Sequence, residues 1–268
     1  EIDLAAVCTT RMESAMEAAE KFGASIAFEN HQDMLAQDAV DTVAVSIRAP
    51  KHYDVTMDAL HAGKHVYTEW PLGTNLQEAE EMANLARKQG VKTMVGLQER
   101  RAPIYMKLKE MIDNGYFGDL LSCSVFWSGS GILERTSEQR WRAETLSGTN
   151  ALTVGLGHVI DPVCLCVGEF TEVSAVSRAQ VPQWIESDTG KVIDVTAPDT
   201  VMICGKTAAG AVVSAVSSTI PWHGSGFRME LYGKNATAII FGSEHSVLSE
   251  MPLMVGKVGT NRMDKIPI

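Results

Sequence analysis

Long apolar runs and a charged leader are both missing from this sequence. No uninterrupted apolar run approaches the ~20 residues that a membrane-spanning helix needs. The first residues, Glu1 to Leu4, lack the basic start and the long apolar region of a signal peptide. Low-complexity segments are also absent. Of the 268 residues, 45% are apolar and 21% are charged, which is typical of a globular protein. These features predict a soluble, cytoplasmic globular protein that does not bind a membrane.

Signatures of disulfide, metal and nucleic-acid chemistry are missing as well. The five cysteines are odd in number, and none pairs with another in the C-x-x-C spacing of zinc or redox motifs. Most of them lie within apolar runs, so we expect buried, reduced thiols and neither a disulfide framework nor a metal site. The net charge of -10 argues against a surface that binds duplex DNA, so we expect no direct nucleic-acid partner.

The motif G-x-G-x-x-G does not occur between a strand and a helix anywhere in the chain. Gly129-Ser130-Gly131 and Gly155-Leu156-Gly157 lie in other contexts. The chain as given therefore lacks the glycine-rich loop that usually cradles a dinucleotide pyrophosphate.

Strands and helices are expected to alternate along the first hundred residues. Apolar runs predict strands at 2–7, 25–28, 40–47 and 92–97 and a short one within 63–72, and amphipathic segments predict helices at 12–22, 31–37 and 76–89 and another that ends at Gly63. This alternation is typical of right-handed β-α-β crossovers and of a doubly wound, Rossmann-like parallel sheet. Without the glycine loop, such a sheet would begin here at its second strand, and the chain alone would bind a pyrophosphate weakly.

The pattern changes after Gly118. Strands are predicted at 120–127, 173–177, 200–204, 212–218, 229–232 and 238–241, with hairpin turns at 205–210 and 233–236. Only one helix, at 150–167, is expected to interrupt them. The fold class is thus α/β followed by α+β: a Rossmann-like domain at 1–101 and a mostly antiparallel, open-sheet domain at 102–268, with the site in the cleft between them.

The first place to look for function is the stretch from Gly63 to Leu72. It runs from a helix-ending glycine through a short apolar strand to Glu69 and Trp70, at the strand end where α/β sheets bind ligands. The Glu69 carboxylate must find hydrogen-bond donors or water there. Trp70 cannot transfer a proton, although a catalytic group would be expected in its place.

The segment Thr9-Thr10-Arg11, directly after the first predicted strand, bears on the choice between NAD and NADP. Thr9, Thr10 and Arg11 either form an ordinary helix start with a solvated arginine or bind an anion at the helix N-terminus. At this position of a Rossmann sheet an acidic residue favours NAD, whereas Thr-Arg accommodates the 2′-phosphate of NADP. We therefore expect NADP, with NAD as the second choice.

Two further groups are candidates for chemistry. His158 lies on an apolar helix three residues before Asp161, and it is either a packing residue or a general acid or base. The cluster Gln98-Glu99-Arg100-Arg101 follows a strand and is either a solvated loop or part of a substrate site.

Together these motifs resemble one known family. In chain order they are Pro50-x-His52, Ala62-Gly63-Lys64-His65-Val66, Glu69-Trp70-Pro71-Leu72, Gly96-Leu97-Gln98-x-Arg100-Arg101-x-Pro103, Gly115-x-x-Gly118 and Gly157-His158-x-x-Asp161. The combination resembles the glucose-fructose oxidoreductase/inositol dehydrogenase (Gfo/Idh/MocA) family from about residue 1 to 245.

The resemblance implies a protein that binds NAD(H) or NADP(H) and acts on a carbohydrate or polyol, with homo-oligomers formed through the C-terminal sheet. We assign to the cofactor site Thr9, Thr10, Arg11, Ser46, Ile47, Arg48, Pro50, His52, Glu69, Trp70 and Gln98. His158 is the expected catalytic acid or base, and Trp70, Arg101, His158 and Asp161 are the expected substrate contacts.

Two departures from the family pattern affect the expected chemistry. Dehydrogenases of this family usually have Glu-Lys-Pro where this chain has Glu69-Trp70-Pro71, and they tend to place an aspartate where it has Val154. Of their Lys, Asp and His set, only His158 remains. Acid-base groups contribute ~10²- to 10⁴-fold, so the loss of two partners can leave cofactor binding intact while suppressing turnover.

These departures leave two hypotheses. Glu-Trp at the lysine position, Gly90-Val91-Lys92-Thr93, Leu97-Gln98 and the motif from Gly157 to Asp161 resemble one branch of the family, the fungal galactose-regulon repressors. The protein is then either an NAD(P)-dependent oxidoreductase with an atypical site or a catalytically silent, dinucleotide-binding sensor or repressor.

Overall fold

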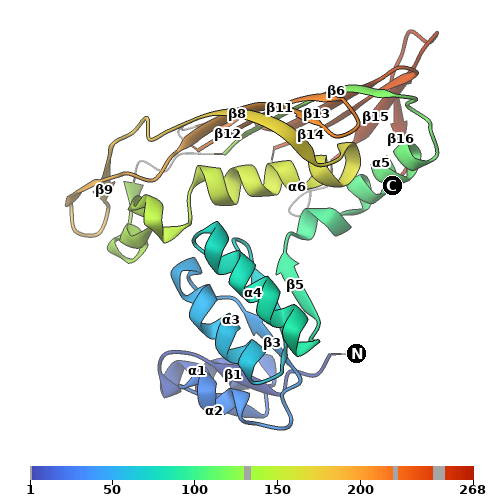
Figure 1. Ribbon diagram of the computed structural model, residues 1–268. Helices are drawn as coiled ribbons and strands as arrows, with labels where there is room; N and C mark the ends of the chain where they lie inside the picture. Colours follow the sequence, from blue (N-terminus) through green and yellow to red (C-terminus); the bar gives the residue numbers. More distant parts are fainter. Residues whose placement is uncertain (1, 130–133, 220–222, 244–250) are drawn as a thin grey trace. The chain divides into compact units, whose positions relative to one another are not determined.

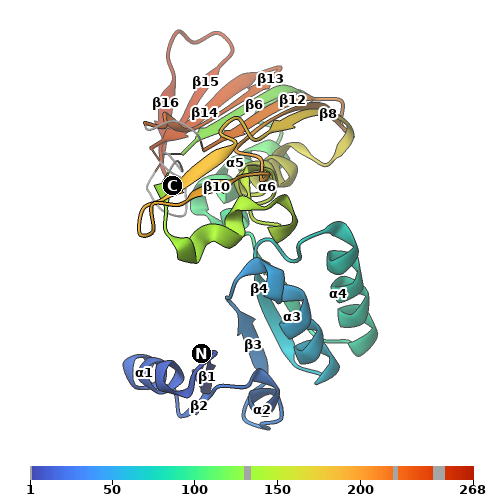
Figure 2. The same cartoon turned by 90° about the vertical axis from the view of Figure 1, so that its left-hand side faces the viewer.

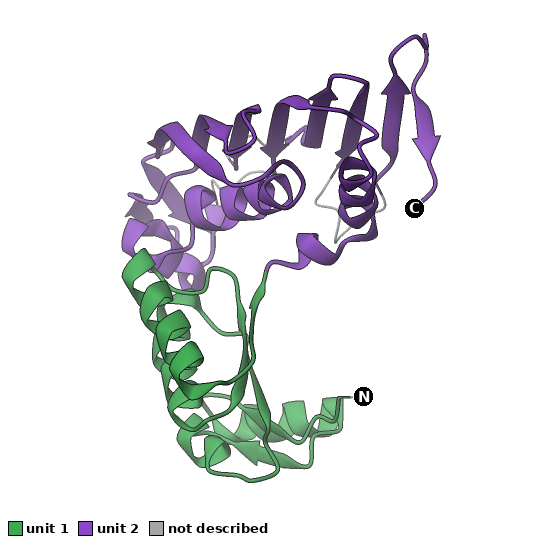
Figure 3. Ribbon diagram, turned by 45° about the vertical axis from the view of Figure 1, so that its right-hand side comes forward, with its two compact units in different colours: residues 1–96 green, residues 97–268 purple. Residues whose placement is uncertain are grey.

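The computed structural model of the chain describes residues 2–129, 134–219, 223–243 and 251–268. The chain forms two compact units, residues 1–96 (unit 1) and 97–268 (unit 2), which are coloured separately in Figure 3. The short 3₁₀ helix Gln98–Arg101 (η2) belongs to unit 2. A domain division after residue 101 stays a prediction.

Unit 1 has the alternating order of strands and helices that the sequence predicts. In chain order its elements are β1 (Ala6–Cys8), α1 (Met12–Phe22), β2 (Ile26–Phe28), α2 (His31–Leu35), β3 (Thr42–Val45), α3 (His52–His61), β4 (His65–Glu69), α4 (Leu76–Gln89) and β5 (Thr93–Gly96) (Figure 1). The predicted strand at 2–7 is wrong in its first part. Ile2 is 99% exposed and Leu4 is also exposed, so this apolar run is not buried.

The strands of unit 1 form two parallel sheets, β1–β2 and β3–β4–β5 (Figure 2). The Rossmann-like, parallel α/β character is therefore confirmed. In the standard Rossmann strand order, 3-2-1-4-5-6, these sheets correspond to strands 3-2 and 4-5-6. No strand of the described residues of unit 1 joins β1 to β3.

Glycine and asparagine set the ends of the two long helices of unit 1. The C-cap residues Gly23 of α1 and Gly90 of α4 have φ values of 77° and 67°, in the left-handed region where a Cβ is unfavourable. The Asn75 side chain accepts a hydrogen bond from the backbone N–H of Glu78 at the start of α4. These local signals explain why 12–22 and 76–89 are predicted with correct bounds.

Unit 2 is built on a sheet of eight strands with two helices on one face (Figure 1). The strands are β6 (Leu120–Ser128), β8 (Phe170–Arg178), β11 (Thr200–Thr207), β12 (Val212–Ser218), β13 (Gly226–Gly233), β14 (Ala236–Gly242), β15 (Leu253–Lys257) and β16 (Asp264–Ile266), in the order β16-β15-β14-β13-β6-β12-β11-β8. All neighbours are antiparallel except β12 and β6, which confirms the mostly antiparallel open sheet.

The two helices are α5 (Pro103–Asp113) and α6 (Leu156–Val167). The helix predicted at 150–167 is present, but its first turn, Ala151–Gly155, is π-helical, and Asn150 caps it. Side chains of α5 and α6, among them Leu108 and Val159, pack on inward-facing residues of the sheet such as Val213. Helix α5 is not among the predicted elements.

A second, small sheet of unit 2 is also unpredicted. It consists of β7 (Glu134–Arg135), β9 (Gln183–Glu186) and β10 (Val192–Asp194), in the order β10-β9-β7. The 3₁₀ helix Ser137–Ala143 (η3) contributes Ala143 to a separate cluster with Trp184, Val195 and Ala197.

The described parts of the chain contain no helix that is both long and apolar enough to span a bilayer. All five cysteines are free, and burial raises the pKa of Cys123, Cys164 and Cys166 to about 12. The expectation of buried thiols is wrong for Cys204, which is exposed on β11, on the sheet face away from the helices.

Candidate functional site

Glu69, at the end of β4, lies in a small polar arrangement with its neighbours. The Tyr67 hydroxyl donates a hydrogen bond to Glu69 Oε1 at 2.8 Å. Glu69 pairs with Gly96 of β5, and a Cβ at position 96 would collide with the Glu69 carboxylate and the Tyr67 hydroxyl. Sequence reasoning gives Tyr67 no role and names Gly96 only within a family motif, although strand alternation places Tyr67 and Glu69 on one face of β4.

His52 ties the ends of two neighbouring strands together. The ring is 1% exposed, with Nδ1 at 2.8 Å from the carbonyl oxygen of Pro71 and Nε2 at 3.0 Å from that of Ile47. In either neutral tautomer one ring N–H donates to one of these carbonyls. The loops that follow β3 and β4 are thereby held at one sheet edge. This burial favours a supporting role for His52, and direct contact with a cofactor stays a prediction.

Most of the other predicted cofactor residues of unit 1 lie in these same two loops. Ser46, Ile47, Arg48 and Pro50 are exposed after β3, and Trp70 is half-buried after β4. Carboxyl ends of adjacent parallel strands are where α/β sheets bind ligands. The structure therefore brings these residues together with Glu69 at one edge of the β3–β4–β5 sheet.

Thr9, Thr10 and Arg11 lie at the end of β1, in the other sheet of unit 1. Thr9 Oγ1 lies 2.6 Å from Ser14 Oγ and donates to the carbonyl oxygen of Arg11 at 2.8 Å. Thr10 and Arg11 are exposed where α1 begins. These contacts form a compact helix start and leave two exposed side chains beside it.

The acidic candidate of unit 2 is held by an arginine. Arg100 of η2 donates from Nε to Asp161 Oδ1 at 2.5 Å, and Asp161 is 7% exposed. Burial raises the pKa of Asp161, while the hydrogen bond and charge of Arg100, and the charge of His158 when that ring is protonated, oppose the rise. Sequence reasoning names Arg100 only within a family motif and as a member of the cluster 98–101, which is either a solvated loop or part of a substrate site, and does not pair it with Asp161.

His158 lies in the first turn of α6, one helical turn before Asp161, and it is half-buried. The preceding π-helical turn packs closely on the sheet because residue 155 is glycine: a Cβ there would collide with Ser217 Oγ on β12. Gln98 and Arg101 are exposed on η2, the same helix that carries Arg100. His158, Asp161, Arg100 and Arg101 thus lie on two elements that pack together, α6 and η2.

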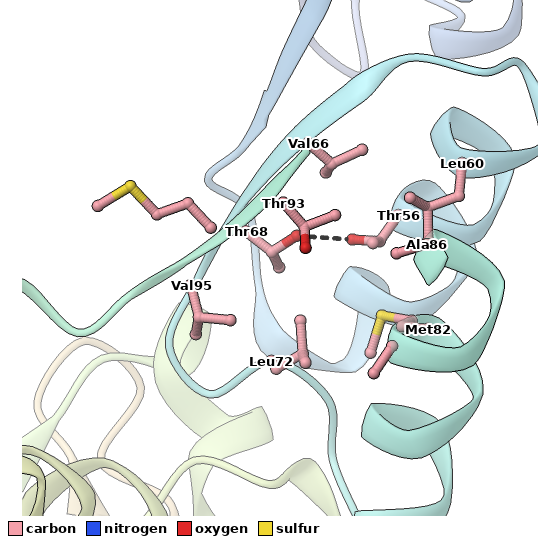
Figure 4. Close-up of a pocket in the computed structure, with 11 residues that line it drawn as sticks. Thr56, Leu60, Val66, Thr68, Leu72, Met82, Ala86, Thr93 and Val95 are labelled. Atoms are coloured by element: carbon pink, nitrogen blue, oxygen red, sulfur yellow. Dashed lines mark hydrogen bonds between the residues drawn. The ribbon is translucent and has the colours of Figure 1, made fainter. Parts of the chain in front are cut away.

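A cavity of about 120 Å³ lies behind β4, between the sheet and helices α3 and α4 (Figure 4). Its lining is apolar apart from a few threonines, and Thr56 Oγ1 lies 3.0 Å from Thr68 Oγ1. No predicted site residue lines this cavity. Among the described residues, no three His, Cys, Asp or Glu side chains gather as a metal site would require.

Comparisons with known proteins match both parts of the chain. Residues 1–97 match the model of an oxidoreductase family with an NAD-binding Rossmann fold, Gfo/Idh/MocA. Residues 103–244 match the model of the C-terminal domain of Gal80p.

Curated relatives include dehydrogenases and a regulatory protein. Dehydrogenase aclE of Aspergillus oryzae is 35% identical over 191 residues, which are 69% of this chain and 52% of the relative. The galactose/lactose metabolism regulatory protein GAL80 of Saccharomyces cerevisiae is 26% identical over 72% of this chain and 47% of its own length. Levoglucosan dehydrogenase of Pseudarthrobacter phenanthrenivorans is 27% identical over 87% and 63%, respectively. The chain thus spans about half the length of the first two relatives.

Solved structures share the fold along nearly the whole chain. An NAD binding oxidoreductase from Klebsiella pneumoniae has a TM-score of 0.87 at 26% identity, over 98% of this chain and 69% of that one. Levoglucosan dehydrogenase in complex with NADH and L-sorbose has a TM-score of 0.89 at 23% identity, over 99% and 71%. From its two matched regions and its fold, the chain belongs to the Gfo/Idh/MocA oxidoreductase family, with a Rossmann region followed by a Gal80p-like C-terminal domain.

Proposed function

We propose that this protein is an NAD(P)-dependent oxidoreductase that acts on a sugar, a polyol or a related hydroxy compound. The observation that carries the proposal is the pair His158 and Asp161 at the start of α6. Asp161 is buried, accepts a hydrogen bond from Arg100, and lies close enough to His158 for their charges to interact. Histidine titrates near neutral pH and is the side chain most often used for proton transfer. The relative named levoglucosan dehydrogenase favours a carbohydrate substrate.

In this proposal the predicted catalytic and substrate residues have distinct roles. His158 accepts the proton of the substrate hydroxyl, while Arg101 and Asp161 bind neighbouring hydroxyl groups. Trp70 packs its indole against the face of a sugar ring, and Glu69 and Gln98 orient the substrate and the cofactor. These assignments follow the strand-end position of Glu69 and Trp70 and the shared position of the others on α6 and η2.

NADP is the proposed cofactor and NAD the second choice. Thr10 and Arg11 are exposed at the end of β1, with no carboxylate between Cys8 and Glu13, and this fits the 2′-phosphate of NADP. The exposed loop after β3 fits the middle of a dinucleotide, whereas the described residues offer no glycine-rich loop for its pyrophosphate. When bound, the cofactor supplies the hydride acceptor or donor. One relative was solved with NADH, which keeps NAD in consideration.

The second candidate function is a dinucleotide-binding sensor or repressor without turnover. It is favoured by Trp70 at the family's lysine position and Val154 at its aspartate position. The match of 103–244 to the Gal80p C-terminal domain points the same way.

An activity assay separates the two candidates. The full-length protein is mixed with NADP⁺ or NAD⁺ and a panel of sugars and polyols, and the nicotinamide absorbance is followed. We expect turnover that falls ~10²- to 10⁴-fold in His158→Ala, the usual contribution of an acid-base group. The control is His61→Ala, which removes an exposed histidine at the end of α3. Cofactor binding without turnover across the panel would instead favour the sensor.

We also propose that the protein forms homo-oligomers through the outer face of the eight-stranded sheet. A row of outward side chains crosses six neighbouring strands in register: Phe241, Arg228, Phe126, Val216, Met202 and Val176. Five of these six are apolar, and Phe241, Phe126, Met202 and Val176 are 40% or more exposed. A continuous apolar patch of this kind marks an interface. The Arg228–Glu230 ion pair on the same face supplies both charges that a symmetric contact between two copies needs.

A further inference from the structure

The small sheet of unit 2 concentrates positive charge on one face. Arg135 of β7 pairs in register with Glu186 of β9, and Trp184 lies two residues earlier on the same face of β9. Helix η3 carries Arg140 and Arg142, and its Ala143 packs in the same apolar cluster as Trp184.

The one buried carboxylate of this face is already fully used. Glu186 is 2% exposed; its Oε1 accepts from Arg140 Nε at 2.7 Å, and its Oε2 accepts from Arg140 Nη2 at 2.8 Å and from the Thr189 hydroxyl at 2.5 Å. This bidentate pair neutralises Arg140 only. The exposed Asp188 accepts two hydrogen bonds from Ser137.

Arg135 and Arg142 therefore have no acidic partner among the residues that the structure describes. Both guanidinium groups are partly buried, and burial lowers both pKa values, that of Arg135 to about 10. Arg142 precedes Ala143, which packs in one cluster with Trp184, and the Arg135 guanidinium lies against the Trp184 ring. In keeping with this placement, the charge of Arg142 lowers the pKa of Arg135 further. Two like charges in a partly desolvated place are unfavourable unless an anion joins them.

This region also holds two buried donors, one on Arg135 and one on Trp184. Arg135 Nε and Trp184 Nε1 are both buried and have no acceptor within the described parts of the chain. The Arg135 guanidinium lies over the Trp184 ring, 5.4 Å from its centroid, so the two side chains are neighbours. A water molecule could accept from both, but it would leave the charges of Arg135 and Arg142 uncompensated.

We propose that Arg135, Arg142 and the indole N–H of Trp184 form a binding site for an oxyanion, the carboxylate or phosphate group of a small molecule. Guanidinium groups bind such planar or tetrahedral anions through paired N–H donors, and the indole N–H adds a neutral donor. This site does not depend on the proposed oxidoreductase activity, since it involves neither His158 nor the strand ends of unit 1.

The test is calorimetric titration of the full chain with inorganic phosphate and, in a second arm, with succinate, in chloride buffer of constant ionic strength. We expect saturable binding of at least one of them at one site per chain, weakened at least tenfold in Arg135→Met and Arg142→Met. Trp184→Phe keeps the ring and removes only the N–H, so it should weaken binding less. The control is Arg262→Met, because the Arg262 side chain is 80% exposed. The arm that binds more tightly identifies the group.

Thermal unfolding distinguishes a ligand site from a structural role. Without phosphate or succinate, Arg142→Met should keep or raise the melting temperature, because it removes an uncompensated charge, and it should abolish the rise that the bound anion causes. A lower melting temperature together with an unchanged anion response would overturn the proposal. Absence of saturable binding in both arms would also overturn it.

Discussion

The Glu69 carboxylate keeps its place at the end of β4 because position 96 of β5 has no side chain. We predict that Gly96→Ala destabilises the protein by about 1–3 kcal/mol, the usual cost of overpacking, since the added methyl would overlap Glu69 and Tyr67. Urea denaturation measures the change. The control is Gly256→Ala on β15, where a Cβ would lie 3.2 Å from Met263 Cγ and 3.3 Å from the Arg262 carbonyl oxygen, a milder overlap than that with Glu69 Oε2 at position 96, so a smaller loss is expected. Equal losses in the two variants would contradict this account.

The Arg100–Asp161 pair makes stability depend on pH in a predictable direction. Burial raises the pKa of Asp161 above its unfolded value, so this group's contribution is complete below about pH 4 and is lost as the pH rises through the folded pKa. Removing Arg100 takes away a positive charge that favours ionised Asp161. The pKa of Asp161 then rises further, and the free energy of unfolding lost at neutral pH becomes larger.

We therefore predict that Arg100→Met costs about 2–3 kcal/mol at pH 7, less than the ~3–5 kcal/mol of a broken buried pair, because Arg100 is half-exposed. The cost should shrink towards pH 4, and denaturation curves at several pH values measure it. Lys107→Met, which removes a more exposed pair with Glu110, should cost little at any pH. A cost for Arg100→Met that does not change with pH would show that the charge of Asp161 is not the cause.

Among the elements, α6 depends on how its first, π-helical turn is capped. The Asn150 side chain accepts from the backbone N–H groups of Leu152 and Thr153, and Thr153 Oγ1 accepts from the Asn150 N–H. We predict that Asn150→Ala lowers stability by about 1 kcal/mol, as loss of an N-cap does. Thermal melting measures it, with the exposed, mid-helical Asn84→Ala of α4 as the control. A melting temperature that falls no more than the control's would count against the cap.

Local signals explain which elements the sequence could predict. Helices α1 and α4 end at Gly23 and Gly90, and hairpin β11–β12 follows from the glycines around its turn, because each of these features depends on neighbouring residues. Helix α5 has an equally local sequence signal, which the sequence-based prediction does not use. Its buried residues Ile104, Tyr105, Leu108 and Met111 have helical spacing, and Pro103 stands at its first position.

Contacts between distant residues explain what sequence reasoning could not supply. Strand β7 has two residues, and its partner β9 lies some fifty positions later. No local sequence pattern therefore predicts the small sheet or the position of its arginines. Two features of the candidate site likewise depend on contacts that only the folded chain shows. They are the space that Gly96 leaves for Glu69 and the ion pair between Arg100 and Asp161. The candidate residues at strand ends and on α6 could be named in advance, but their neighbours could not.

At the scale of the whole molecule, the outer sheet face should decide the assembly state. We predict that the double variant Phe126→Glu, Met202→Glu shifts the protein towards the monomer, because it places charges in the middle of the apolar row. Light scattering coupled to gel filtration measures the mass. Val258→Glu is the control, since Val258 is 75% exposed in the turn between β15 and β16. A wild-type protein that is already monomeric at high concentration would refute the interface.

The central claim is that this chain belongs to a working oxidoreductase despite Trp70, and hydride transfer tests it most directly. The protein is incubated with NADP⁺ or NAD⁺ and a panel of carbon-deuterated sugars and polyols, and mass spectrometry measures deuterium in the reduced nicotinamide. The account predicts that deuterium appears with at least one substrate and that His158→Ala lowers its rate ~10²- to 10⁴-fold while cofactor binding persists. Tight cofactor binding with no deuterium transfer from any substrate would contradict it and would leave the sensor as the better explanation.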